Sequence, residues 1–173
     1  MRGLKGKNVL ITGGSSGIGQ AIAVRFAEYG ANVAINYLRR PEEAADTAER
    51  VDACVRQVMQ EGVRHLLVGG DVSVEDEVVA MVDQATGGLG GLDVLVNNAG
   101  IQLSRPSHEL SAADFDKVLA VNLRGAFLCA RQAIGRFLDA GTPGVVLNVS
   151  SVPSASPSRA TSATRSARAA WPT

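Results

Sequence analysis

A glycine-rich segment near the start of the chain has the residue types and spacing of a phosphate-binding loop. It reads Thr-Gly-Gly-Ser-Ser-Gly-Ile-Gly over residues 12–19 and follows the apolar residues 9–11. The backbone N–H groups of such a loop, with the start of the next helix, face an incoming pyrophosphate. We expect Gly13 to allow the sharp turn, Gly17 to admit the phosphate closely and Gly19 to let helix pack on strand. An ordinary tight turn is the competing interpretation.

Polar residues also follow later apolar segments. Asp71 comes after residues 65–68, and Asn98 after residues 92–97. Ligands collect at the carboxyl edge of parallel sheets, and an aspartate there can accept a hydrogen bond from an adenine amino group. Both residues also suit ordinary turns, with Asp71 capping the helix that follows.

Strand and helix patterns alternate along the chain. Strands are expected at 8–12, 32–37, 65–68, 92–97 and 145–150, and helices at 17–29, 41–61, 74–88 and 111–140. Ser73 and Ser111 are expected as helix N-caps. Because the strands are apolar on both faces, the alternation predicts an α/β fold with a Rossmann-type, doubly wound parallel sheet of about five strands.

Composition excludes several functional classes. Seventeen basic and seventeen acidic residues cancel, so we expect neither a nucleic-acid nor a membrane partner. The apolar runs are too short for a membrane span. Two cysteines are too few for a disulfide framework, and the isolated His65 and His108 do not suggest a metal site. We expect a cytoplasmic protein.

Five motifs in one order resemble the short-chain dehydrogenase/reductase family. They are the loop 12–19, with three residues between its first two key glycines, then Asp71-Val72, Asn-Asn-Ala-Gly at 97–100, Asn122, and Asn-Val-Ser-Ser-Val at 148–152. Residues 107–111 and 122–128 look most like the glucose 1-dehydrogenase branch. The resemblance implies hydride transfer between a nicotinamide cofactor and a small alcohol or carbonyl, with a sugar as one candidate.

The resemblance also implies a set of cofactor-binding residues. The loop residues Gly13, Ser15, Ser16, Gly17, Ile18 and Gly19 would hold the diphosphate, Asp71 and Val72 the adenine, and Asn98, Ala99 and Gly100 the adenosine ribose side.

The end of the second strand bears on the choice between NADP and NAD. NAD-binding Rossmann sites usually carry an acid there, whereas this strand ends with Asn36 and Tyr37, followed by Arg39 and Arg40. A guanidinium can pair with a 2′-phosphate, so we expect NADP at Asn36 and Arg39. Solvated arginines and dual specificity for NADP or NAD are the alternatives.

The catalytic residues implied by the resemblance are incomplete. Ser151 matches the family's substrate-polarising serine and Asn122 its supporting asparagine. The family's acid is a tyrosine thirteen residues after the serine, with a lysine four residues later. Thr164 and Arg168 stand at those positions. Threonine has no accessible ionisation near neutrality and arginine stays charged, so we expect an inactive chain.

Residues 153–173 differ in composition from residues 1–152, which we assign to the NAD(P)-binding domain. This tail contains Ser, Ala, Thr, Arg and Pro but no aliphatic residue larger than alanine, and we expect it to be disordered. Reading the gene one nucleotide upstream could turn Thr164 into tyrosine and Arg168 into lysine, which suggests a frameshift near Val152.

Three interpretations stay open. The chain is an inactive oxidoreductase by ancestry, a dinucleotide-binding pseudoenzyme, or a non-functional truncated product. In each case we expect the family's homo-oligomer interface to be incomplete.

Overall fold

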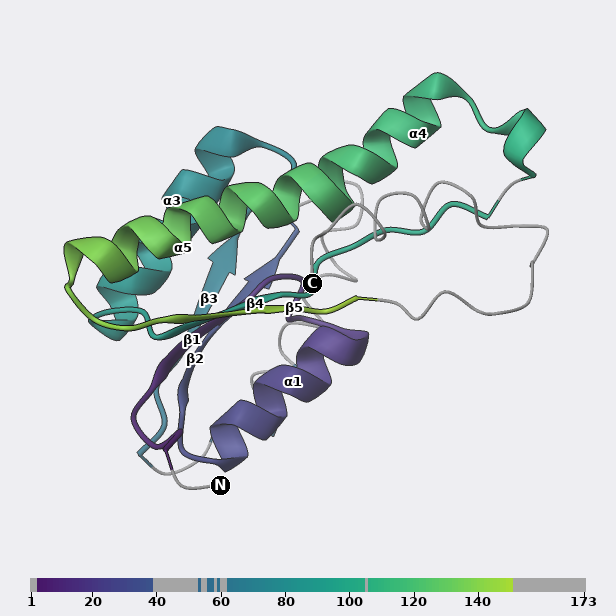
Figure 1. Ribbon diagram of the computed structural model, residues 1–173. Helices are drawn as coiled ribbons and strands as arrows, with labels where there is room; N and C mark the ends of the chain where they lie inside the picture. Colours follow the sequence, from purple (N-terminus) through teal and green to yellow (C-terminus); the bar gives the residue numbers. More distant parts are fainter. Residues whose placement is uncertain are drawn as a thin grey trace.

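Five strands form one parallel sheet, seen edge-on in Figure 1. The computed structural model describes residues 3–38, 53, 56, 57, 59, 62–104 and 106–150. The strands are β1 (Asn8–Ile11), β2 (Asn32–Tyr37), β3 (His65–Gly69), β4 (Val94–Asn97) and β5 (Val145–Asn148), in the order β3-β2-β1-β4-β5. The expected doubly wound α/β fold is confirmed. Most of the helix expected at 41–61 and all of the tail 153–173 lie outside the described residues.

The central strands are buried because helices cover both faces of the sheet. Helix α1 (Gly17–Glu28) lies on one face, while α3 (Glu75–Leu89) and α5 (Ala126–Asp139) lie side by side on the other (Figure 1). Alternate residues of β1 enter the two cores: Leu10 packs with the α3 and α5 side, and Val9 and Ile11 pack with the α1 side. Both faces of a parallel strand are thus apolar, as its sequence indicates.

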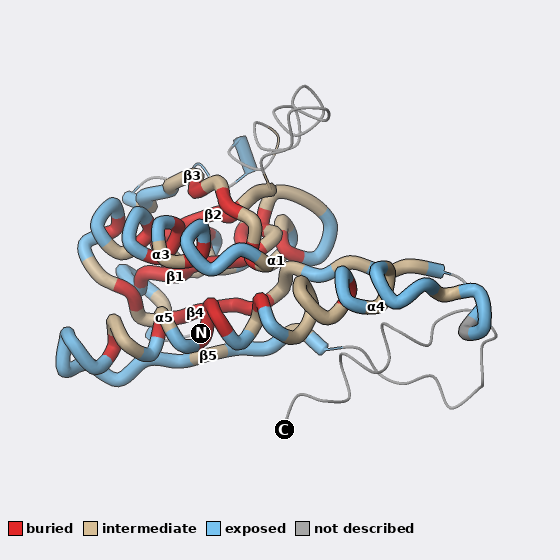
Figure 2. The backbone as a smooth tube through the Cα atoms, turned by 90° about the horizontal axis from the view of Figure 1, so that it is seen from above, coloured by how far each residue is buried: buried red, intermediate tan, exposed pale blue. Residues whose placement is uncertain are grey.

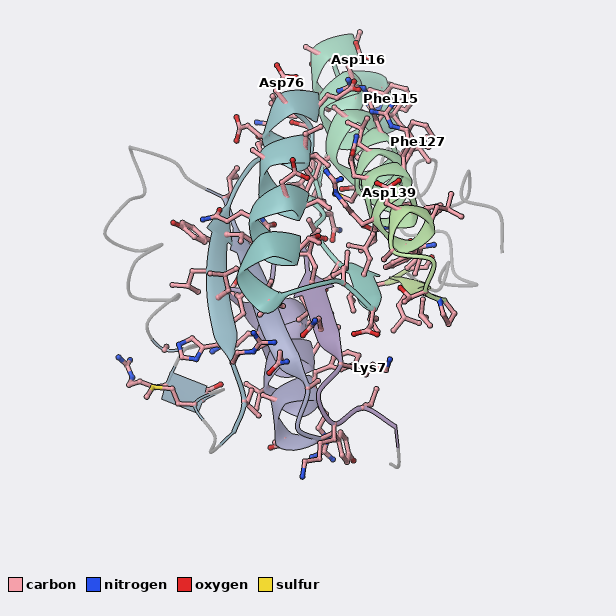
Figure 3. All side chains as sticks on the ribbon, turned by 90° about the vertical axis from the view of Figure 1, so that its left-hand side faces the viewer. Lys7, Asp76, Phe115, Asp116, Phe127 and Asp139 are labelled. Atoms are coloured by element: carbon pink, nitrogen blue, oxygen red, sulfur yellow. The ribbon has the colours of Figure 1, made fainter. Side chains whose placement is uncertain are left out.

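Ion pairs join α3 to α5 where the two helices face each other (Figure 3). Arg131 of α5 contacts Glu75 of α3 at 2.5 Å, and Arg136 contacts Asp83. The labelled Phe127 lies on the outer side of the pair and is exposed (Figure 3).

Of the two helix N-caps expected from the sequence, the structure confirms the one that precedes α4 but not the one that precedes α3. The Ser111 side chain accepts a hydrogen bond from the Asp114 N–H at 3.0 Å, so this N-cap is confirmed. The expectation for Ser73 was wrong, because the N-cap of α3 is Val74. Both the N–H and the hydroxyl of Ser73 donate to Asp71 Oδ1 instead, and this turn delays the helix by one residue.

The helix expected at 111–140 is confirmed as one uninterrupted helical run over residues 112–139, but it is not α-helical throughout. It consists of α4 (Ala112–Leu119), a π-helical segment η3 (Ala120–Gly125) and α5. A preceding single turn, η2 (Ser107–Glu109), leads into α4. Figure 2 shows α4 projecting beyond the body of the sheet, while α5 lies against it. The wider π turn, often found at functional sites, lies where the helix leaves the sheet.

Strand β5 forms the least covered edge of the sheet (Figure 2). Val145 and Leu147 are 51% and 45% exposed, whereas the neighbouring Val94 and Val96 of β4 are 7% and 1% exposed. Among the described residues, no strand pairs with the outer edge of β5. Within the same residues, no helix is long and apolar enough to cross a membrane.

Candidate functional site

The candidate site lies where the direction of chain winding reverses. From β1 the chain proceeds outward to β2 and β3, and then returns to place β4 on the other side of β1. Ile11 is paired with Val96, so the segments after both strands leave the same edge of the sheet side by side. In doubly wound folds, this switch point is where ligands bind.

Thr12 and Asn98 join these two segments. The Thr12 hydroxyl accepts hydrogen bonds from the N–H groups of Asn98 and Ala99, each at 3.0 Å. Asn98 Nδ2 donates to the carbonyl oxygens of Thr12 and Gly13 at 3.0 and 3.1 Å. Asn98 therefore holds the glycine-rich loop from behind. Contact of Asn98, Ala99 and Gly100 with a ribose stays a prediction.

Glycine is required at three positions of the loop for different structural reasons. Gly13 and Gly17 have φ of 60° and 55°, the left-handed region that favours glycine. A Cβ on Gly19 would collide with the Gly13 carbonyl, so the close contact made by Gly19 is with the loop itself. A Cβ on Gly17 would meet nothing within 4 Å. Gly17 therefore borders open space at the place where we expect the phosphate.

The N-terminus of α1 is suited to an anion. Its N-cap Ser16 makes no side-chain capping bond, and its first turn contains no acid. By contrast, Ser111 caps α4, and the first turn of α3 carries three acids at 75–77. Uncapped N–H groups and the positive end of the helix dipole attract phosphate. The loop, with exposed Ile18 and half-buried Ser15 beside it, thus fits a diphosphate.

Asn36 is turned into the protein. Its side chain accepts from the Gly13 N–H at 3.0 Å and donates to the carbonyl oxygens of Val68 and Gly70 at 3.2 and 3.0 Å. The residue is 2% exposed. Sequence reasoning placed Asn36 among the NADP-binding residues but gave no sign of this inward bridge, and its contact with the cofactor stays a prediction. Arg39 lies outside the described residues.

Asp71 begins the turn that leads into α3. Its Oδ1 accepts from the N–H and the hydroxyl of Ser73 at 2.8 and 2.7 Å. Within the described residues, Oδ2 has no hydrogen-bond partner. Asp71 thus has the turn role considered as an alternative, and one oxygen is left for the adenine contact, which stays a prediction. Val72 is buried behind it, and Gly125 packs so closely that a Cβ there would lie 2.9 Å from the Val72 carbonyl oxygen.

Asn122 lies in the π-helical segment and fixes the chain that follows Gly100. Its Oδ1 accepts from the Ile101 N–H at 2.8 Å, and its Nδ2 donates to the Ile101 carbonyl at 2.9 Å. This paired contact positions the helix against the segment after β4. Ser151 lies just beyond the described residues, so the two matched catalytic residues are not both placed, and Asn122 as a catalytic residue stays a prediction.

Asn97 is a site residue that sequence reasoning did not single out by itself. It is buried, and its Nδ2 donates to Ala126 O at 3.1 Å and to Asn148 Oδ1 at 3.0 Å. Asn97 and Asn148 are register partners in β4 and β5. The available signal was Asn97 at the end of the predicted strand 92–97, together with Asn148 inside the predicted strand 145–150. Among the described residues, Asn97 Oδ1 has no hydrogen-bond partner.

Other reactive groups contribute little in the described part of the chain. No three His, Cys, Asp or Glu side chains gather there in a metal-binding arrangement. Burial raises the pKa of the Cys129 thiol to about 12, so this cysteine is protonated near neutrality and packs in the core. The candidate chemistry therefore rests on the loop and strand ends.

Comparisons with known proteins agree with this geometry. The short chain dehydrogenase family model matches residues 7–171. The 3beta-hydroxysteroid dehydrogenase 1 of Eggerthella lenta is 43% identical over 149 residues, 86% of this chain and 54% of that protein. Glucose 1-dehydrogenase of Gluconobacter oxydans is 42% identical over 147 residues, 85% of this chain and 53% of that protein. The chain therefore spans about half the length of these curated relatives.

A solved structure gives the same result at the level of the fold. The short chain dehydrogenase from Burkholderia cenocepacia J2315, in complex with NADP, aligns with a TM-score of 0.83 and 34% identity, covering 96% of this chain and 64% of that one. The expected similarity to glucose 1-dehydrogenases is also confirmed. With a family match over residues 7–171 and a shared sheet, the chain belongs to the short-chain dehydrogenase family.

Proposed function

We propose that this chain binds NADP, or NAD, at the carboxyl edge of its sheet. The observation that carries the proposal is the uncapped start of α1 beside Gly17, where the backbone is left-handed and a Cβ would meet nothing within 4 Å. A diphosphate placed there would accept hydrogen bonds from N–H groups of the loop and of the first helical turn. Loop residues 13–19 thus bind and orient the dinucleotide.

The two ends of the dinucleotide would lie on either side of this loop. The adenine would lie at Asp71 and Val72, and the turn before α3 supports this because it leaves Asp71 Oδ2 unbonded within the described residues. On the other side, Asn122 fixes the Ile101 backbone and orients the segment that would border the nicotinamide. When bound, the nicotinamide supplies or accepts the hydride.

The preference for NADP is supported by charge. No acid ends β2, and Asn36 is turned inward, so nothing at these two positions repels a 2′-phosphate. Arg39 follows two residues after the strand and is suited to pair with that phosphate. The relative from Burkholderia cenocepacia was solved with NADP. NAD remains the second cofactor to test.

By ancestry the reaction is hydride transfer with a small alcohol or carbonyl substrate, and glucose is one candidate. The chain retains Ser151 and Asn122 but has Thr164 and Arg168 at the spacing of the family's tyrosine and lysine. Neither residue can serve as a tunable acid near neutrality. We therefore propose dinucleotide binding without turnover, in a cytoplasmic protein.

A titration with NADPH and NADH tests binding, and a parallel assay tests turnover. NADPH fluorescence should increase on binding to the purified chain, with weaker binding of NADH. When glucose and NADP are added to the chain, the absorbance at about 340 nm, where NADPH absorbs, should not change. Lack of binding by a folded chain would overturn the proposed function. Turnover would instead overturn the assignment of inactivity.

A further inference from the structure

We infer that Asn36 is a positioning residue that sets the shape of the phosphate-binding loop and couples it to the adenine-binding turn. This inference rests on the proposed dinucleotide binding. It differs from the role expected from sequence, in which Asn36 would bind NADP directly. The geometry points to an action through Gly13 and Gly70.

Asn36 accepts hydrogen bonds from two consecutive N–H groups of the loop. Its side-chain oxygen accepts from Gly13 N at 3.0 Å, and its main-chain oxygen accepts from Gly14 N at 2.8 Å. Both groups therefore point into the protein. The N–H groups from residue 15 onward are left to face an anion, so Asn36 determines where the anion-binding part of the loop begins.

Asn36 also binds the segment that precedes the turn at Asp71. Asn36 Nδ2 donates to Gly70 O at 3.0 Å and to Val68 O at 3.2 Å. Gly70 immediately precedes Asp71, whose carboxylate holds the turn into α3. One buried amide therefore connects the segment proposed to bind the diphosphate with the segment proposed to bind the adenine.

The hydrogen bonds made by the Asn36 side chain require an amide. The side chain must accept at Oδ1 and donate at Nδ2 in fixed directions, and the residue is 2% exposed, so water cannot replace either bond. Aspartate would set a carboxylate against the carbonyl oxygens of Val68 and Gly70. Leucine would leave the N–H of Gly13 and both carbonyls without partners.

The same strand supplies a matched control. Asn32 lies at the opposite end of β2 and is 6% exposed. Its Nδ2 donates to Asn8 Oδ1 at 2.9 Å, and its Oδ1 accepts from Arg64 N at 2.9 Å. It is thus a buried, bridging asparagine like Asn36, but it contacts neither the loop nor the turn at Asp71. A general effect of losing a buried amide should appear at both positions.

The experiment compares Asn36→Ala and Asn32→Ala in the full chain. Chemical denaturation measures the stability of each variant, and NADPH fluorescence measures the Kd where each is folded. Both substitutions should lower the denaturation midpoint. Asn36→Ala should raise the Kd for NADPH at least about tenfold, whereas Asn32→Ala should change it less than about twofold. Equal Kd values for the two variants would overturn the inference.

Hydrogen exchange of the wild-type chain keeps the inference testable if the variants do not fold. The amides of Gly13 and Gly14 should exchange slowly before NADPH is added, and NADPH should protect residues 15–19 further. Fast exchange at Gly13 would contradict the inward hydrogen bond. If the wild-type chain binds neither NADPH nor NADH, the proposed function fails, while slow exchange at Gly13 would still support the role of Asn36 in the loop.

Discussion

At the scale of single residues, the loop depends on glycine for three separate reasons. Gly13 needs a left-handed backbone, Gly19 needs the absence of a side chain against Gly13, and Gly17 combines a left-handed backbone with open space. Only the last condition concerns the ligand. The effect of a side chain at Gly17 should therefore be largest on binding, and backbone strain must be measured separately.

Gly62 allows that separation. It has φ of 78°, close to the 55° of Gly17, and a Cβ at either position would meet nothing within 4 Å. Alanine at each site should lower the free energy of unfolding by about 1 kcal/mol, the cost of a left-handed alanine. Only Gly17→Ala should weaken NADPH binding, by about tenfold or more, because only Gly17 borders the phosphate position. Fluorescence titration checks the Kd; equal affinities in the two variants would contradict a phosphate at Gly17.

At the scale of elements, sequence patterns locate the strands but miss the π-helical segment inside the long helix. The strands are continuous apolar runs, which define their positions within a few residues. The helical pattern over 111–140 looks continuous because η3 adds only a small offset to the periodicity. What places the π turn is tertiary contact: Asn122 pairs with Ile101, and Gly125 packs on Val72. Such contacts between distant residues cannot be read from local spacing.

The candidate site shows the same division. The glycine loop could be located from residue spacing because the local backbone geometry requires glycine at each position. The inward direction of Asn36 and the double hydrogen bond of Asn98 to the loop could not, because they depend on which strands become neighbours. Strand order, rather than composition, brings these amides to the loop.

The contact between α3 and α5 gives a prediction for pH. The hydrogen bond and charge of Arg131, together with the charge of Arg124, lower the pKa of Glu75 below its ordinary value. A carboxyl with a lowered folded-state pKa contributes stability above its unfolded pKa, and loses it as pH falls through the folded pKa. Glu75→Gln should therefore reduce stability at pH 7, and the difference from wild type should shrink as pH falls below the unfolded pKa of about 4.3 and vanish only below the lowered folded-state pKa.

Asp76 provides the control for this prediction. It lies in the same first turn of α3 and points away from the sheet in Figure 3, and no ion pair joins it to another described residue. Asp76→Asn removes the same charge near the helix dipole without removing an arginine contact. Urea denaturation from pH 3 to 8 should show a larger pH-dependent loss for Glu75→Gln. The same loss in both variants would assign the effect to the helix dipole alone.

At the scale of the whole molecule, and within the described residues, the central strands are well covered, whereas β5 is the most exposed strand. The two cores bury β1, β2 and β4, but on β5 the face carrying Val145 and Leu147 is about half exposed (Figure 2). Exposed apolar strands at a sheet edge favour association with other chains. We therefore expect the full chain to self-associate through this exposed apolar face of β5 as its concentration increases.

Substitutions on the two faces of β5 test this expectation. The double variant Val145→Thr with Leu147→Thr makes the exposed face polar, and threonine is itself a residue that favours strands. Self-association should therefore decrease with little loss of stability. Val146 points to the other face and packs against the core with α3 and α5, so Val146→Thr should destabilise the chain by about 1–2 kcal/mol without reducing association. Sedimentation velocity over a concentration series measures the first effect, and urea denaturation the second. If the double variant associates as strongly as wild type, a surface other than this face of β5 mediates the contact.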